Sequence, residues 1–421
     1  LVISKNTFKS LHQKIFFLLV LLLPTQLGLH FWPDWASVFG IRVDYLSPTI
    51  YLTDILVIML LFSWMLSSKF QISNFKFQIK YLALFIYLLA TSLIVAQNSG
   101  VAIYKLIKLA EFSLLGWCVY KNYKLYIVNS AFKLVLAAAM LYSCVIAWVQ
   151  FLTGHTVGGL LWLLGERNFG VSTPGIALVN IGGIDYLRAY ATFPHPNVLA
   201  GFLLVGILLL FAGPAPGFPL TRVTRSIVAC AISTIILSFS HSAWIAGLVA
   251  LVFLNIDWFR KRTKLFTQYT FFGVLILSLI IPVATSKVDT SALPEEIVRR
   301  IDLSKAAMNM AADSPLFGVG IGNFVVRLPE YGSAPAVSWW LQPVHNVFLL
   351  VLTETGLIGL GFVIWLLLFV SKKLITNHYS LFTAFLVILI TGMTDHYWLT
   401  LQQGQLMATI VFAASIATIK R

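Results

Sequence analysis

Three histidines stand directly before long apolar segments, and they are the residues in this sequence best suited to proton transfer. His195 lies in ATFPHPNVLAG, His241 in SFSHSAWIAG and His345 in PVHNVFLL. Imidazole exchanges protons near neutral pH, which makes histidine a frequent general base. Each is expected at a helix N-terminus, where free N–H groups and the helix dipole attract phosphate. A single such histidine is more often an interfacial side chain, but three equivalent ones favour a site.

Polar residues near these histidines could complete an anion site. Arg188 lies seven residues before His195. Arginine stays charged and can hold a phosphate through two parallel hydrogen bonds. The local sequence fits such a clamp and an ordinary ion pair with Asp185 equally well. Arg167 and Arg327 are weaker candidates for the same role. Asn197 and Asn346, which follow two of the histidines, are expected to cap helices or to contact substrate.

A second group of ionisable residues lies in an apolar segment. Lys105, Lys108 and Glu111 follow one another at intervals of three in YKLIKLAEF, so they share one side of a helix. Charges inside a membrane are costly and usually face a partner or a wet cavity. Asp54 is expected at a similar depth. The group is either a structural ion-pair cluster or a site for the phosphates of a lipid.

Glu354 is the carboxylate within the apolar segment that follows His345. The two residues are nine positions apart, which places them on opposite sides of a straight helix. They are therefore not expected to act on the same atom. We predict a structural role for Glu354, in which its carboxylate orders neighbouring helices or loops through hydrogen bonds.

Composition indicates which kind of structure must position these residues. The chain has 421 residues, of which 59% are hydrophobic and 10% charged, and its mean hydropathy is +0.89. These values are typical of a polytopic membrane protein. The formal net charge of +14 therefore does not indicate a nucleic-acid partner, because lysine and arginine accumulate in the cytoplasmic loops of membrane proteins. The three cysteines show neither metal-site spacing nor an obvious pairing.

Apolar segments of spanning length predict about twelve transmembrane helices in one membrane domain covering residues 1–421. The predicted ranges are 14–32, 46–67, 80–97, 101–120, 133–152, 196–213, 226–240, 242–258, 265–284, 346–370, 379–396 and 399–418. Most of the 29 basic residues fall in alternate connections. This distribution predicts that both termini are cytoplasmic. The first span resembles the start of a signal peptide but is expected to remain uncleaved.

Two long connections fall on the external side of this predicted topology. One covers 153–195 and the other 285–345. The second contains PEEIVRRIDLSKAAMNMAAD, whose apolar residues recur at helical spacing and predict an amphipathic helix. SPLFGVGIGNF follows it. Its glycines indicate a tight, irregular connection, because no strand precedes them as a nucleotide-binding turn would require.

Several of these stretches together resemble one family. HNVFLLVLTETGLIGLG is similar to the histidine motif in the last large periplasmic loop of the O-antigen ligase and polymerase superfamily: His345, Asn346, nine residues, Gly356, two residues, Gly359. DSPLFGVGIGNF, RAYATFPHPNVLAGF and IYLTDILVIML resemble further family segments. The resemblance covers most of the chain. No single motif is very specific, but their order is.

The resemblance implies an all-α, GT-C-like glycosyltransferase of the bacterial inner (cytoplasmic) membrane, with its active site facing the periplasm. The donor would be a glycan on undecaprenyl diphosphate. The acceptor would be a lipid-linked glycan, a lipid A core or a protein hydroxyl. The reaction would invert the sugar configuration and need neither metal nor cofactor.

The resemblance also assigns roles to residues. His345 would be the general base and Arg188 the diphosphate clamp, supported by His195, Asn197 and Asn346. Family members commonly carry an arginine in the turn where this chain has His241. A protonated His241 could replace that arginine, Arg327 could compensate for it, and Lys105 and Lys108 could reach the phosphates of the carrier.

Two other functions remain open at this level. A transporter of a lipid-linked glycan or small anion would need broken spans and charges near the bilayer midplane. This chain instead places its histidines at the external ends of spans. The departure at His241 leaves room for a catalytically impaired family member with a structural or partner-binding role.

Overall fold

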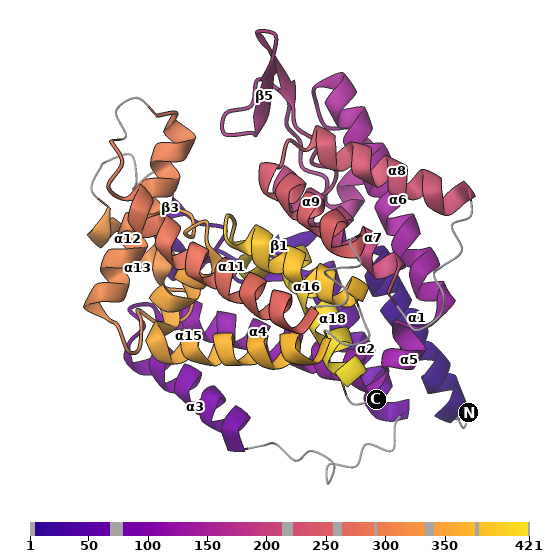
Figure 1. Cartoon of the computed structure of the whole chain (residues 1–421), viewed down its shortest axis with the longest axis horizontal. Coiled ribbons are helices and arrows are strands. Elements are labelled where there is room, and N and C mark those ends of the chain that lie inside the picture. Colours follow the sequence, from indigo (N-terminus) through magenta and orange to yellow (C-terminus); the bar gives the residue numbers. More distant parts are fainter. Residues whose placement is uncertain are drawn as a thin grey trace.

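Helices make up most of the structure, as the sequence predicts. The computed structural model describes residues 5–67, 79–212, 222–255, 263–289, 293–332, 341–374 and 379–419. Within them, Ser130–Thr153 and Val347–Ser371 are long and apolar enough to cross a membrane, and several shorter apolar helices accompany them. The described residues form a mainly helical structure (Figure 1), which is consistent with an all-α membrane protein.

Each predicted span overlaps one helix of the structure. These helices are α1 (Lys5–Leu21), α2 (Leu52–Ser67), α3 (Ile79–Ile94), α4 (Ser99–Lys121), α6 (Ser130–Thr153), α7 (Pro196–Leu210), α8 (Arg222–Leu237), α9 (His241–Asn255), α11 (Thr263–Thr285), α15 (Val347–Leu374), α16 (Tyr379–Gly392) and α18 (Gln402–Ile419). That all twelve cross a bilayer remains a prediction. Many of the basic residues behind the predicted orientation, including Lys69, Arg260, Lys420 and Arg421, lie outside the described residues.

The limits predicted for the first two spans are wrong. α1 ends at Leu21, and the chain then forms strand β1 (Gly28–His30), which pairs antiparallel with β4 (Thr49–Tyr51). Pro24 follows the end of α1 and cannot supply the N–H that a continuing helix needs. Gly28 lets the strands approach, because a Cβ there would lie 2.8 Å from the Tyr51 ring. The connection between the strands holds a short helix, η1 (Asp34–Ala36), and the pair β2 (Ser37–Val38) and β3 (Ile41–Arg42).

The predicted eleventh span also ends too late. α16 stops at Gly392, and the following turn leads into the one-turn helix α17 (Tyr397–Thr400) before α18 begins. The turn is fastened to α16, because the indole Nε1 of Trp398 donates to Thr391 Oγ1 over 2.8 Å. This places Asp395 and His396 in a connection between helices.

The two long connections are folded. The first contains the 3-10 helix η3 (Gly159–Leu164) and the hairpin of β5 (Leu178–Ile181) and β6 (Ile184–Leu187), which projects from the body of the molecule (Figure 1). The second contains α12 (Glu295–Asp313) and α13 (Phe324–Tyr331). α12 covers the stretch that was predicted to form an amphipathic helix; it buries Ile301 and packs against α15.

Glu354 binds the connection between α12 and α13, which confirms the predicted structural role. Its Oε1 accepts from the backbone N–H of Phe324 over 3.4 Å, and its backbone oxygen accepts from the N–H of Gly320 over 3.0 Å. Gly318, Gly320 and Gly322 all have positive φ, as a tight irregular connection requires. α15 itself is kinked at Gly356, whose φ is 66°.

The large apolar core surrounds α7, most of whose residues are buried. α7 packs against α6, α8, α9, α16 and α18. A second, smaller core joins η1 and the first turn of α4 to the second half of α12, to α13 and to the start of α15. The ends of several of these elements line the large cavity that holds the candidate site.

Candidate functional site

A large cavity opens where the polar ends of several elements meet. Its volume is about 1280 Å³. It is lined by the β1–β4 region, the first half of α4, the connection before α7, the start of α12, the residues before α15 and the connection between α16 and α18. Of the candidates from the sequence, seven line it: Arg167, Arg188, His195, Asn197, His345, Lys105 and Lys108.

Arg188 is held by the protein on one side of its guanidinium. Nε donates to the carbonyl oxygen of Ser238 over 2.7 Å, and Nη2 donates to Asn197 Oδ1 over 3.0 Å and to Phe239 O over 3.2 Å. Nη1 has no hydrogen-bond partner among the described residues. Burial lowers the pKa of Arg188, and the charges of Glu296 and Asp395 act in the opposite direction. The guanidinium of Arg188 is therefore held in one orientation, with Nη1 available at the cavity.

His195 and Asn197 shape the N-terminus of α7. The Nδ1 of His195 accepts from the N–H of Asn197 over 3.2 Å, so the histidine caps the helix. Pro196 is the first residue of α7, as predicted for its missing N–H. Burial lowers the pKa of His195 to about 4, against the opposing charge of Asp395. His195 is therefore neutral at physiological pH and leaves the anion-binding charge to arginine.

Asp395 connects the α7 terminus to a pair of histidines. Its Oδ2 accepts from Asn197 Nδ2 over 2.9 Å, and its Oδ1 accepts from the N–H of His396 over 2.8 Å. The ring of His396 lies edge-on to that of His345, with centroids 5.1 Å apart. Burial alone would raise the pKa of Asp395, but the histidines and the Asn197 hydrogen bond lower it to about 2. One chain of contacts thus joins Arg188 to His345.

In the described part of the structure, His345 has an unpartnered ring nitrogen and a lowered pKa, both of which suit a general base. Its Nδ1 is buried and has no hydrogen-bond partner among the described residues. Burial first, and then the neighbouring His396, lower the pKa of His345 well below its usual range, while Asp395 raises it in part. A neutral imidazole beside a buried carboxylate can accept a proton and have its new charge balanced.

Sequence reasoning missed three groups at this site. Asp395 and His396 were assigned to the end of a predicted span, although an adjacent acid and base at a span end is itself a signal of function. Arg300 lies in the stretch that was predicted only to form an amphipathic helix. The structure brings it to the cavity, where Nη1 donates to Thr394 O over 3.2 Å and Nη2 pairs with Glu296 over 2.9 Å.

Arg167 also lines the cavity and adds a further cation. Its Nη2 donates to Pro194 O over 2.7 Å, and its guanidinium lies 5.2 Å from the centroid of the Phe169 ring. The N-terminus of α7, Arg188, Arg300 and Arg167 therefore give one part of the cavity a positive character that suits a diphosphate.

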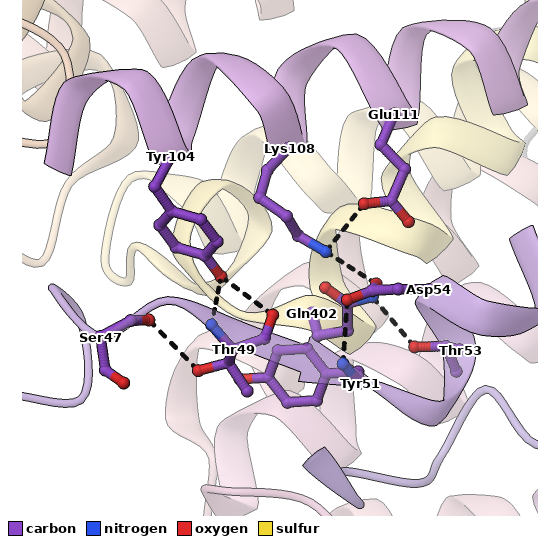
Figure 2. A network of polar contacts seen from close by, with 9 residues as sticks. All are labelled: Ser47, Thr49, Tyr51, Thr53, Asp54, Tyr104, Lys108, Glu111 and Gln402. Carbon is purple, nitrogen blue, oxygen red and sulfur yellow. Dashed lines mark hydrogen bonds and ion pairs between the residues drawn. The ribbon is translucent and has the colours of Figure 1, made fainter. Parts of the chain in front are cut away.

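The lysines of α4 lie at another part of the cavity wall and behave differently from each other. Lys108 Nζ contacts Asp54 over 2.7 Å and Glu111 over 2.9 Å, within the buried network of Figure 2. Gln402 joins it by donating to Asp54 and to Thr53. Lys108 is thus engaged in a structural cluster. Lys105 has no ion pair within 4.0 Å among the described residues, and its Nζ lies 5.3 Å from the centroid of the Tyr104 ring.

Three candidates from the sequence do not line the cavity. His241 begins α9, is exposed, and lies edge-on to Trp244 with centroids 5.2 Å apart. Arg327 pairs with Glu330 over 2.7 Å on α13. Asn346 caps α15, where its Oδ1 accepts from the N–H groups of Phe348 and Leu349 over 3.0 Å each. The predicted capping by Asn346 is confirmed.

The comparison with protein families bears on the same region. Residues 226–364 match the family described as O-antigen ligase, a range that includes α12, His345 and most of α15. No curated protein matches the chain significantly. This match supports the resemblance to the O-antigen ligase and polymerase superfamily, and in general terms an O-antigen ligase-type glycosyltransferase activity.

Proposed function

We propose that the protein transfers a glycan from undecaprenyl diphosphate to an acceptor hydroxyl at the outer face of the cytoplasmic membrane. The observation that carries this proposal is the single cavity in which Arg188 and His345 are linked through Asn197, Asp395 and His396. A base and an anion clamp in one polar cavity are the two groups that glycosyl transfer from a diphosphate needs.

Arginine carries the leaving-group side of the reaction. When the bond between the anomeric carbon and the diphosphate oxygen breaks, its electron pair stays on the diphosphate. Arg188 offers its free Nη1 to this growing charge, and Arg300 and the N-terminus of α7 add positive potential. Because the protein already holds Nε and Nη2 of Arg188, little reorganisation is needed during the reaction.

Histidine carries the acceptor side. The oxygen of the acceptor hydroxyl attacks the anomeric carbon on the face opposite the diphosphate, which inverts the configuration. The hydroxyl proton passes to the imidazole of His345. Asp395 balances the imidazolium that forms, and His396 keeps the His345 ring in place by edge-on contact.

The proposed orientation rests on the origin of the cavity lining. All its segments belong to connections or span ends that the predicted twelve-span topology places outside: the β1–β4 region, 153–195, the start of α4, 285–345 and the connection before α18. Both termini would then be cytoplasmic, and the cavity would face the periplasm.

The experiment that tests this proposal replaces His345 or Arg188 with alanine in cells that depend on this protein for glycan transfer. Each substitution should reduce the transferred glycan by about 10²-fold or more and lead to accumulation of the lipid-linked donor. The matched control is Lys305→Ala, which removes an α12 cation that does not line the cavity. Normal glycan levels in both cavity variants, at normal protein levels, would refute the proposal.

A further inference from the structure

A short apolar segment at the edge of the cavity is exposed in a way that a loop in water would avoid. We call residues 157–165, VGGLLWLLG, the rim segment. Its 3-10 helix η3 contains no buried residue, and the exposed fractions are 83% for Leu160, 64% for Trp162 and 53% for Leu163. Apolar patches of this kind mark contact with a partner or a membrane.

The first end of the rim segment is fastened by a buried carboxylate. Glu166 is 4% exposed. Its Oε1 accepts from Val157 N over 2.9 Å and from Gln150 Nε2 over 2.7 Å, and its Oε2 accepts from Gly158 N over 2.7 Å. Gly158 has a φ of 76°, which lets the chain turn outward immediately after this anchor.

The other end is fastened to the connection that follows α1. Thr25 Oγ1 donates to the carbonyl oxygen of Leu164 over 2.7 Å. Gly165, with a φ of 81°, packs so closely on the backbone of Gln26 and Leu27 that a Cβ would clash there. Polar contacts therefore hold both ends of the rim segment. The folded structure itself keeps Leu160, Trp162 and Leu163 exposed.

The rim segment follows α6 in the sequence, and α6 is one of two helices among the described residues that are long and apolar enough to span a membrane. Leu134, Leu141, Val145 and Leu152 are exposed on this helix. Their spacings of seven, four and seven place them on one side of it. Leu152 lies in the last turn, so the outward apolar face runs along α6 to its end and is followed by the rim segment.

The same segment borders the cavity. Val157, Gly158, Gly159, Trp162 and Gly165 are among the lining residues. We propose that the rim segment inserts Leu160, Trp162 and Leu163 among the acyl chains of bilayer phospholipid at the external membrane interface, and so holds the cavity mouth at the membrane surface. Tryptophan and leucine are suited to this position, because the indole ring favours the headgroup level. This inference does not depend on the reaction proposed above.

Fluorescence quenching in the full-length protein tests the inference. The protein is reconstituted into phosphatidylcholine vesicles with ordinary or with brominated acyl chains. The chain has 12 tryptophans, so the signal of Trp162 is taken as the difference between the native protein and Trp162→Phe. That difference should fall about twofold or more in brominated vesicles, and acrylamide in the water should quench it weakly.

A matched variant reports on a tryptophan inside the protein. Trp398, which is 4% exposed, is replaced by Phe, and its signal should respond to neither quencher. In a Leu160→Asn, Leu163→Asn variant, the Trp162 signal should lose its bromolipid quenching and become sensitive to acrylamide. If the native Trp162 signal responds to acrylamide and not to bromolipid, the segment lies in water. If it responds to neither, protein covers it. Either result overturns the inference.

Discussion

At the scale of single residues, burial and neighbouring charges determine which groups of the site are ionised and which are neutral. Asp395 is kept ionised, and His195, His345 and His396 have lowered pKa values because they are buried. The arginines Arg188 and Arg300 therefore carry the positive charge toward the cavity. A neutral His345 beside an ionised Asp395 is the protonation state in which a base can act on a hydroxyl.

The pH dependence of glycan transfer should reflect these protonation states. In the proposed mechanism neutral His345 is the active form. Because the pKa of His345 is lowered, activity should persist as the pH falls through about 6.5, the usual value for histidine. The decline at acid pH should have its midpoint below that value. The measurement is the pH profile of kcat/KM for the purified protein. A midpoint above 6.5 would contradict the assignment of His345.

Removing the carboxylate of Asp395 should move the loss of activity to still lower pH. Asp395 raises the pKa of His345, so Asp395→Asn should shift the midpoint to lower pH by about one unit or more. The lost charge balance should also reduce the rate at neutral pH. Asp185→Asn is the control, because Asp185 lies on the β5–β6 hairpin, bound to Asn180, and does not line the cavity. Identical profiles for Asp395→Asn and the native protein would show that Asp395 does not act on His345.

At the scale of elements, a buried polar cluster joins three helices at the wall of the cavity. Lys108 of α4 contacts Asp54 of α2, and Gln402 at the start of α18 donates to the same carboxylate (Figure 2). α18 directly follows the connection that bears Asp395 and His396. We therefore expect the cluster to help position Asp395 and His396 at the candidate site.

Lys108→Met should destabilise the protein strongly. It leaves the carboxylates of Asp54 and Glu111 buried together without their cation, which costs about 3–5 kcal/mol in comparable buried pairs. Thermal unfolding of the purified protein in detergent checks this. Adding Asp54→Asn to Lys108→Met should recover part of the loss. Arg327→Gln, which breaks the more exposed pair with Glu330, should change the unfolding free energy by only about 0–1 kcal/mol. Equal losses for the two single variants would contradict the account.

The kink in α15 should require glycine at position 356. Gly356 has a φ of 66°, and a Cβ there would clash with the carbonyl oxygen of Leu316. Gly356→Ala should therefore lower the unfolding free energy by about 1–3 kcal/mol or more. Gly361→Ala is the control on the same helix, because a Cβ there meets no atom within 4 Å. Differential scanning fluorimetry compares the two variants. Equal melting temperatures would show that the kink tolerates a side chain.

The elements could be predicted from the sequence because long apolar segments and their turns leave a strong local signal. The pair β1–β4 could not, since three-residue strands carry no recognisable periodicity and form only when Gly28 meets Tyr51. Arg188 and His345 could be named from residue type and position. The contribution of Arg300 could not, because it depends on how α12 packs over the cavity. His241 was selected by its turn, and the structure places its side chain outside the cavity.

At the scale of the whole molecule, a large cavity is lined by helix ends and by the connections between helices in the described part of the chain. Its cationic part and its histidine part lie on different elements that are joined by Asn197 and Asp395. This arrangement suits a reaction with a charged leaving group and a neutral acceptor. It also separates the two tasks, since Arg188 would serve donor binding and His345 would serve the transfer step.

The most direct test of the central claim measures these two tasks separately. Undecaprenyl diphosphate is titrated into the purified native protein and into its Arg188→Ala and His345→Ala variants, and glycan transfer is assayed in the same samples. We predict that Arg188→Ala weakens binding of undecaprenyl diphosphate about tenfold or more. His345→Ala should bind it as the native protein does and yet lose transfer. Undiminished binding by Arg188→Ala, together with undiminished transfer by His345→Ala, would contradict the account.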